Sequence, residues 1–267
     1  MKKAMFVFFA AVFLAGFAFA GGSKDGDTSV LKVGATPEPH AEMLNLVVED
    51  LAAAGYTLEV IEFTDYVTPN EALESGQIDA NFFQHLPYME SFNAERGYHL
   101  TNAGGIHIEP MALYSRKGAA SPADLAGGVI AIPNDPTNEG RALLLLQSAG
   151  LITLDADAGI TATPLDIVSN PSALTFREIE AASLPRVLED VDAAVINGNY
   201  AIPAGLSIQD DALFVEGADS PYVNIIAVRA GSETDPRITA LVQALCSEKI
   251  RAFIAERYPN GEVVPVF

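Results

Sequence analysis

Hydrophobic and polar positions from about residue 31 onward alternate between the two-residue period of strands and the 3.6-residue period of helices. Residues 31–36 read as a strand, and apolar positions from Met43 to Leu51 then recur with helical spacing until Gly55. This alternation predicts an α/β fold with mostly parallel sheets. Further elements of this first set are a strand at 57–63, a helix at 70–76, a strand at 79–83 and a helix at 86–96.

A second set of alternating elements begins after the stretch at residues 109–115. Its pattern predicts strands at 129–133, 174–179, 193–197 and 223–228, and helices at 138–149, 184–189 and 236–258. We expect lobe 1 to comprise 31–111 plus 223–267 and lobe 2 to comprise 112–222, joined by two crossing segments with a central ligand cleft. A single continuous sheet of similar content is the alternative that periodicity leaves open.

The first 20 residues have the pattern of a signal peptide. Lys2 and Lys3 precede an apolar run, and residues 18–20 form a small-x-small cleavage site. Residues 21–30 then read as a flexible tether. An uncleaved leader that serves as a membrane anchor is the alternative, although the apolar run is short for a span of roughly 20 residues.

Composition and charge narrow the class of protein. About half of the 267 residues are hydrophobic, which is enough for a substantial core, and the formal net charge is −20. A strongly acidic chain is repelled by nucleic acid and by anionic membrane surfaces, so neither is an expected partner. Cys246 is the single cysteine, which excludes an intrachain disulfide.

Residues 132–141 form the most informative stretch for ligand chemistry. A strand ends in a proline-rich loop, Asn138 can cap the next helix, and Arg141 then falls in its first turn. An anion at this place would meet free backbone N–H groups, the positive helix end and a guanidinium group. Arg141 can equally form a structural salt bridge, and the sequence alone leaves this open.

Two other clusters combine aromatic and amide side chains. Tyr66, Phe83 and His85 belong to segments in which core packing is the simpler interpretation, although a strand turns Phe82 and Phe83 to opposite faces. Asn197 ends an apolar strand and Asn224 interrupts another, where each amide needs a hydrogen-bond partner from backbone or ligand.

Sequence motifs for catalysis are missing from the chain. It has no GxSxG elbow, no phosphate-binding glycine loop and no HExxH motif. The histidines do not form a tract with metal-ligand spacing. We therefore expect no catalytic residues, no bound metal and no cofactor, with an exported amino-acid-processing enzyme as the alternative class.

Taken together, the segments resemble the NlpA/MetQ family of methionine-binding lipoproteins over about residues 31–267. The segments that carry the resemblance are Gly34-Ala35-Thr36-Pro37, Pro39-His40-Ala41-Glu42, Asp79 to His85, Ile108-Glu109-Pro110-Met111, Ala131 to Asn138, Asp192 to Ala201 and Tyr222-Val223-Asn224.

This resemblance implies a two-lobed periplasmic-binding-protein fold that closes over L-methionine, or a close analogue, and delivers it to the membrane permease of an ABC importer. It implies that Arg141 holds the ligand carboxylate and that Asn197 and Asn224 bind its backbone polar groups. It also implies that Tyr66, Phe83 and His85 surround the thioether side chain. D-methionine and a methionine-containing dipeptide fit the same anchors, and a monomer is expected.

One departure from the family pattern concerns the leader. Members usually carry a lipobox cysteine, whereas here Leu14-Ala15-Gly16 is followed by Phe17. Thioether attachment of lipid is therefore not expected. The chain is expected to be exported and either periplasmic or associated with the cell envelope.

Overall fold

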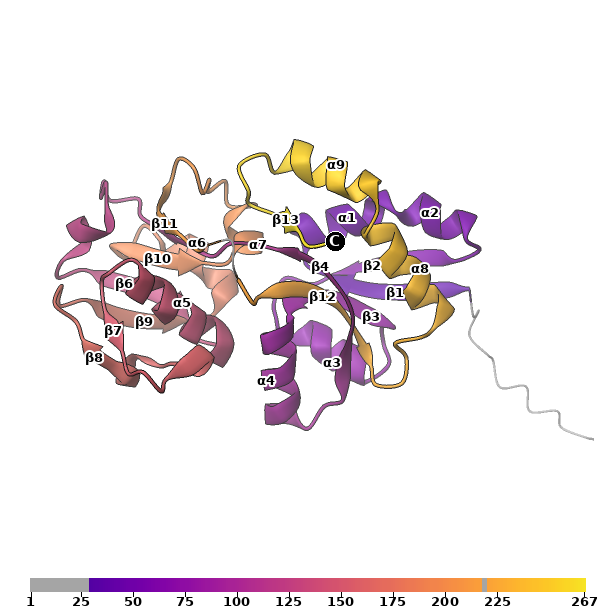
Figure 1. Cartoon of the computed structure of the whole chain (residues 1–267), viewed down its shortest axis with the longest axis horizontal. Coiled ribbons are helices and arrows are strands. Elements are labelled where there is room, and N and C mark those ends of the chain that lie inside the picture. The colour runs from indigo at the N-terminus through magenta and orange to yellow at the C-terminus, as the bar shows by residue number, and fades with distance from the viewer. Residues whose placement is uncertain (1–28, 218–219) are drawn as a thin grey trace, which may run out of the picture.

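The computed structural model describes residues 29–217 and 220–267, so the predicted signal peptide and most of the predicted tether lie outside the described residues. The described chain forms two α/β lobes side by side (Figure 1). Among residues 29–217 and 220–267, no helix combines the length and the apolar character needed to cross a bilayer.

The first lobe contains a six-stranded mixed sheet in the order β13-β4-β12-β3-β1-β2. The strands β1, β2 and β3 run parallel, whereas β12 is antiparallel to both β3 and β4. Their bounds are β1 (Val30–Ala35), β2 (Thr57–Glu62), β3 (Ala80–His85), β4 (Leu100–Ile108), β12 (Val223–Arg229) and β13 (Val264–Pro265).

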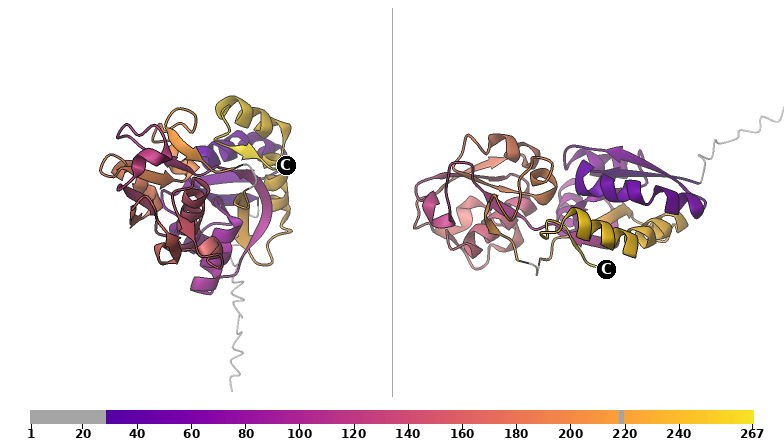
Figure 2. Two further views of the ribbon diagram at one scale, coloured as in Figure 1. Left: turned by 60° about the vertical axis from the view of Figure 1, so that its left-hand side comes forward. Right: turned by 90° about the horizontal axis from the view of Figure 1, so that it is seen from above.

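Helices cover both faces of this sheet because successive strand residues point to opposite sides. In β12, Ile226 and Val228 belong to the cluster with the terminal helices, while Ile225 and Ala227 belong to the cluster with α3 and α4. Figure 2 shows α8 and α9 lying along the first lobe. The helices are α1 (Glu42–Leu46), α2 (Val48–Ala53), α8 (Pro236–Leu245) and α9 (Glu248–Arg257) on one face, and α3 (Thr68–Glu74) and α4 (Leu86–Arg96) on the other.

The second lobe contains a five-stranded sheet in the order β11-β5-β10-β6-β9. Its apolar strands are buried on both faces, by α5 on one and by α6 with α7 on the other. The elements are β5 (Ala112–Tyr114), β6 (Val129–Pro133), β9 (Thr175–Ile179), β10 (Ala193–Ile196), β11 (Ala212–Val215), α5 (Pro136–Ser148), α6 (Leu184–Val187) and α7 (Gly198–Ala201). A small hairpin of β7 (Thr153–Leu154) and β8 (Ile167–Ser169) lies beside them.

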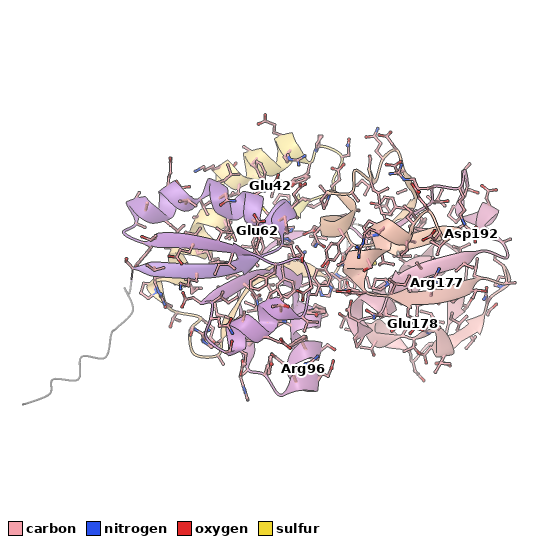
Figure 3. The ribbon with its side chains drawn as sticks, turned by 180° about the vertical axis from the view of Figure 1, so that it is seen from behind. Glu42, Glu62, Arg96, Arg177, Glu178 and Asp192 are labelled. Carbon is pink, nitrogen blue, oxygen red and sulfur yellow. The ribbon has the colours of Figure 1, made fainter. Side chains whose placement is uncertain are left out.

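The chain passes between the lobes once from β4 to β5 and again from β11 to β12. The first segment joins two inner strands, β4 and β5, and the second joins the edge strand β11 to the inner strand β12. Exposed charges such as Arg96 and Arg177 lie away from this junction on the two lobes (Figure 3).

The structure corrects three features of the predicted secondary structure. The sheets are mixed rather than mostly parallel, because β4, β5, β11 and β12 all pair antiparallel. The predicted helix at 236–258 is two helices separated near Ser247. The predicted elements also omitted the nine-residue strand β4.

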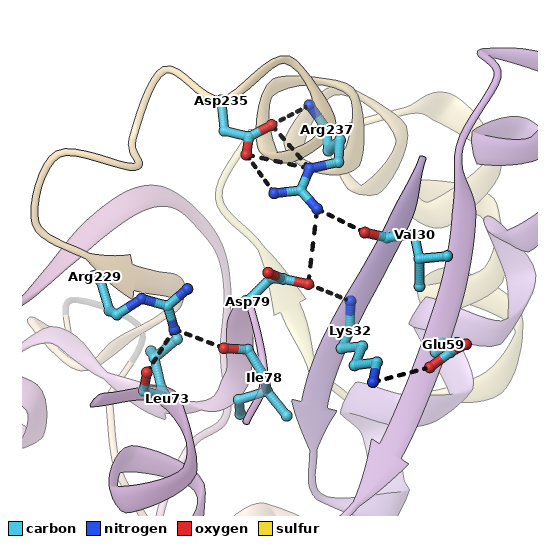
Figure 4. A network of polar contacts seen from close by, with 9 residues as sticks. All are labelled: Val30, Lys32, Glu59, Leu73, Ile78, Asp79, Arg229, Asp235 and Arg237. Carbon is cyan, nitrogen blue, oxygen red and sulfur yellow. Dashed lines mark hydrogen bonds and ion pairs between the residues drawn. The ribbon is translucent and has the colours of Figure 1, made fainter. Parts of the chain in front are cut away.

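A polar network fixes the edge of the first lobe where β1 begins (Figure 4). Arg237 donates to the carbonyl oxygen of Val30 at 2.6 Å and to Asp235 at 2.6 Å, while the backbone N–H of Lys32 donates to Asp79 at 2.8 Å. An open groove of about 1050 Å³ lies beside this network. Since the parallel strands start here, the groove lies at their amino-terminal ends, whereas His85 lies at the carboxyl end of β3.

Candidate binding site between the lobes

A small cavity between the lobes gathers buried polar and aromatic side chains. The space open to a water-sized molecule is about 20 Å³, which is close to the room that one water requires. A ligand as large as an amino acid therefore does not fit the cavity in this conformation. The cavity is far smaller than the outer groove, but its converging polar groups make it the better candidate site. It is lined by Tyr66, Phe83, Gln84, His85, Tyr88, Glu109, Asn138, Arg141, Asn197, Gly198, Asn199 and Asn224.

All six residues singled out in the sequence line this cavity. Lobe 1 contributes Phe83 and His85 from the end of β3 and Asn224 from β12, while Tyr66 precedes α3. The second lobe contributes the other two, Arg141 from α5 and Asn197 from the start of α7. Segments far apart in sequence therefore meet at one place.

His85 ends β3 and caps α4. Its Nδ1 accepts a hydrogen bond from the backbone N–H of Tyr88 at 3.1 Å, so Nε2 carries the hydrogen and donates to Asn138 Oδ1 at 3.2 Å. Burial first, and then the charge of Arg141, lowers the pKa of His85 to about 3. His85 is therefore neutral at pH 7 and bridges the two lobes.

An aromatic wall forms the other side of the cavity in the first lobe. The ring centroid of Tyr66 lies 5.8 Å from Phe83 and 5.8 Å from Tyr88. The Tyr66 hydroxyl donates to Asn199 Oδ1 of the second lobe at 2.5 Å. Phe83 is part of this wall, whereas its neighbour Phe82 is fully buried in the core of the first lobe. The wall offers a surface suited to an apolar ligand side chain.

The start of α5 differs from the sequence-based prediction. Asp135, and not Asn138, caps the helix by accepting from the backbone N–H of Asn138 at 3.0 Å, and Pro136 follows as the first helical residue. Arg141 consequently lies in the second turn. The side chain of Asn138 instead accepts a hydrogen bond from Asn197 at 2.8 Å.

Arg141 is 4% exposed and has partners in both crossing segments. Nε donates to Glu216 at 2.9 Å, and Nη2 donates to Glu216 and, at 2.8 Å, to the carbonyl oxygen of Glu109. The guanidinium also lies over the ring of Tyr222 at 4.3 Å. The Arg141 side chain thus both forms a salt bridge and lines the cavity.

Glu109 is the main cavity residue to which the sequence analysis assigned no role. It is 5% exposed, and burial raises the pKa of its carboxyl group. The Nε2 atoms of His107 and His40 lie 2.7 Å and 3.2 Å from its Oε1 atom. The signal that could have identified Glu109 is that it is the single acidic residue in the mostly apolar stretch 106–113. Gln84, Tyr88 and Asn199 were also not singled out individually.

The ligand-type atoms of His40, His107 and Glu109 lie within 4.8 Å of one another. Tetrahedral zinc with bonds of about 2.0–2.1 Å would hold its donor atoms about 3.4 Å apart. The 2.7 Å separation of His107 and Glu109 is instead a hydrogen-bond length. Hydrogen bonding explains this cluster better than metal ligation.

Two buried amide atoms at the cavity lack hydrogen-bond partners among the described residues. They are Asn197 Oδ1 and Asn199 Nδ2. Buried polar groups are nearly always paired, so such atoms next to a cavity indicate where a polar ligand group would bind. Together with the aromatic wall, they define a site for a small molecule that has both polar and apolar parts.

The fold and this cleft define the class of two-lobed periplasmic substrate-binding proteins. Residues 31–267 match the model of the NlpA lipoprotein family, and the chain belongs to this family.

Three similar proteins support the assignment. The D-methionine-binding lipoprotein MetQ of Escherichia coli is 42% identical over 247 residues, which cover 91% of this chain and 90% of the relative. A nutrient-binding protein from Burkholderia cenocepacia, bound to methionine, is 47% identical with a TM-score of 0.86, covering 89% of this chain and 100% of that chain. An ABC transporter periplasmic substrate-binding protein from Coxiella burnetii is 44% identical with a TM-score of 0.84, covering 88% and 100%.

Proposed function

We propose that this chain is an extracytoplasmic solute-binding protein that captures methionine and delivers it to the permease of an ABC importer. The observation that carries the proposal is the interlobe cavity, which combines a buried guanidinium, a buried carboxylate and unpaired amides with an aromatic wall. An amino acid with a long apolar side chain has this combination of groups. The names of the E. coli and Burkholderia proteins supply the choice of methionine.

We assign the ligand carboxylate to Arg141, because a guanidinium is the natural partner of a desolvated carboxylate. Its contacts to Glu216 and Glu109 occupy Nε and Nη2, which orients the group before the ligand arrives. The ligand carboxylate then competes with or joins Glu216. Tyr66, Phe83 and His85 surround the thioether, which makes favourable contacts with aromatic rings.

The ligand ammonium meets Glu109, Asn197 and Asn224 in this proposal. Glu109 supplies the negative charge, and Asn197 Oδ1 is a buried acceptor without a partner among the described residues. Asn224 Oδ1 already accepts from His40 at 3.2 Å and has a second lone pair to offer. A buried ammonium needs this pairing because an uncompensated buried charge is costly.

Closure brings the two walls together, and the ligand stabilises the closed state by contacting both. We propose lobe boundaries of 31–111 plus 223–267 and 112–222, supported by the membership of the two sheets. Export to the periplasm or cell envelope rests on the pattern of the leader. A non-enzymatic monomer without cofactor or nucleic-acid partner completes the proposal.

The experiment that tests this function is a thermal shift series on protein stripped of ligand by unfolding and refolding. The melting temperature should rise with the concentration of L-methionine. At 100 times its Kd, the ligand should stabilise the folded protein by about 2.7 kcal/mol. Serine and aspartate should not, because they lack the apolar side chain whose burial contributes roughly 1.5–3 kcal/mol. Parallel melts with D-methionine and with a methionyl dipeptide show which of the three ligands stabilises the protein most. An equal response to serine and methionine would contradict the proposal.

A further inference from the structure

The cluster beneath the cavity, formed by Glu109, His40 and His107, has a role beyond packing. We infer that His40 and His107 are positioning residues: His107 donates a hydrogen bond from Nε2 to Glu109, and His40 places its Nε2–H 3.2 Å from the same carboxylate oxygen. Together they keep Glu109 ionised and directed at the ligand ammonium. The inference rests on the proposed function, because it requires a ligand with an ammonium group. It deepens that function by naming what makes the site select amino acids.

The tautomer of His40 follows from its partners. Its Nε2 lies 3.2 Å from Asn224 Oδ1 and 3.2 Å from Glu109 Oε1, and the amide oxygen of Asn224 can only accept. Nε2 must therefore carry the hydrogen. Nδ1 lies 2.8 Å from the hydroxyl of Thr36, which then donates to it. His40 is a neutral donor whose orientation is fixed at both nitrogens.

His107 has the same tautomer for a different reason. Its Nε2 donates to Glu109 at 2.7 Å, while its Nδ1 is buried and has no partner among the described residues. A protonated ring would bury an unpaired N–H at Nδ1. Burial accordingly lowers the pKa of His107 to about 3 and, as the largest cause, that of His40 to about 4. Both rings are neutral near pH 7.

Glu109 also receives a donor from the second lobe. The backbone N–H of Asn199 donates a hydrogen bond to its carboxylate. This approach favours a glycine at position 198, because a Cβ there would make tight contacts of 3.1 Å with Glu109 Oε2 and 3.0 Å with its Cβ. The hydrogen bonds from His107 and Asn199, together with the nearby His40 N–H, oppose the effect of burial and favour the ionised carboxylate. Without the two histidine donors, burial would favour the protonated and uncharged form.

Calorimetry on the whole protein with two ligands tests the role of His107. The ligands are L-methionine and its des-amino analogue methylthiobutanoate, and the variants are His107→Phe and His107→Gln. Glutamine keeps an N–H near the position of Nε2, whereas phenylalanine removes it. His107→Phe should weaken methionine binding about 10- to 100-fold, the worth of a hydrogen bond to a charged group, and leave the analogue within about 2-fold. His107→Gln should restore most of the affinity for methionine.

Equal losses for both ligands, or no loss for either, would overturn the inference and leave His107 a packing residue. A second measurement uses the unaltered protein and so survives a variant that fails to fold. Nitrogen-15 NMR of the imidazole rings at pH 7 should show His40 and His107 as neutral, with hydrogen on Nε2. A protonated ring or the Nδ1–H tautomer would contradict the assignment. A wild-type protein that binds no methionine would contradict the proposed function, whereas the NMR result would still decide the tautomers of His40 and His107.

Discussion

Replacing Arg141 with alanine separates ligand recognition from structural stabilisation. In the closed cleft, the ligand carboxylate is desolvated, so removal of its partner leaves a buried charge uncompensated at a cost of roughly 3–5 kcal/mol. This loss corresponds to about two to four decades in Kd. The same change removes the hydrogen bonds to Glu216 and to the Glu109 carbonyl oxygen. The Glu216 side chain is 16% exposed, so water can partly replace its partner and the folding cost should be about 1–3 kcal/mol.

The matched control is Glu216→Gln, which weakens the salt bridge and keeps the guanidinium. Calorimetric titration with L-methionine and thermal melts should be run on both variants. We expect both to lose stability but only Arg141→Ala to lose affinity by orders of magnitude. Near-normal methionine affinity in a folded Arg141→Ala variant would refute the carboxylate role. Equal affinity losses in the two variants would show that the salt bridge is what binding requires.

Two further predictions concern neighbouring sites. Phe83→Ala should lose mainly methionine affinity and Phe82→Ala mainly stability, because Phe83 lines the cavity and Phe82 is 0% exposed in the core. The total cost of each substitution should be about 3–5 kcal/mol. Calorimetry measures the part lost from affinity, and thermal melts measure the part lost from stability. The reverse division would contradict this placement of the two rings. Burial, and then the carboxylate of Glu178, raises the pKa of Glu139 to about 7. The contribution of Glu139 to stability therefore falls as pH rises from 4.5 to 7. Glu139→Gln should stabilise the protein by about 1–3 kcal/mol at pH 8 but not at pH 4.5. An equal gain at both pH values in urea melts would exclude this cause.

Local signals account for the elements that the sequence predicted well. The helix α4 has the predicted bounds, Leu86–Arg96, because Pro87 favours its first turn and Gly97 ends it with a φ of 69°. The strand β6 (Val129–Pro133) is a short β-branched run that ends at a proline. In both, the residues that decide the boundary lie within the element or next to it.

Non-local pairing explains what the sequence did not predict. The strand β4 contains Asn102 and two glycines, a weak strand signal, and it forms because β12 pairs with it across more than a hundred residues of chain. The break between α8 and α9 was hidden because Leu241, Leu245 and Ile250 continue the buried stripe across it. Periodicity cannot register a break that leaves the apolar stripe intact.

The candidate site shows the same division. The six residues implied by family resemblance all line the cavity. The partners that set their chemistry were not predicted. Glu216 is 75 residues from Arg141, and His40 is 69 residues from Glu109, so only the folded chain brings these groups together.

Isothermal titration of the refolded, ligand-free protein with L-methionine tests the central claim most directly. We predict saturable binding at one site per chain, with a negative heat-capacity change from burial of the apolar side chain. Heats that are indistinguishable from dilution, in protein shown by circular dichroism to be folded, would contradict the account.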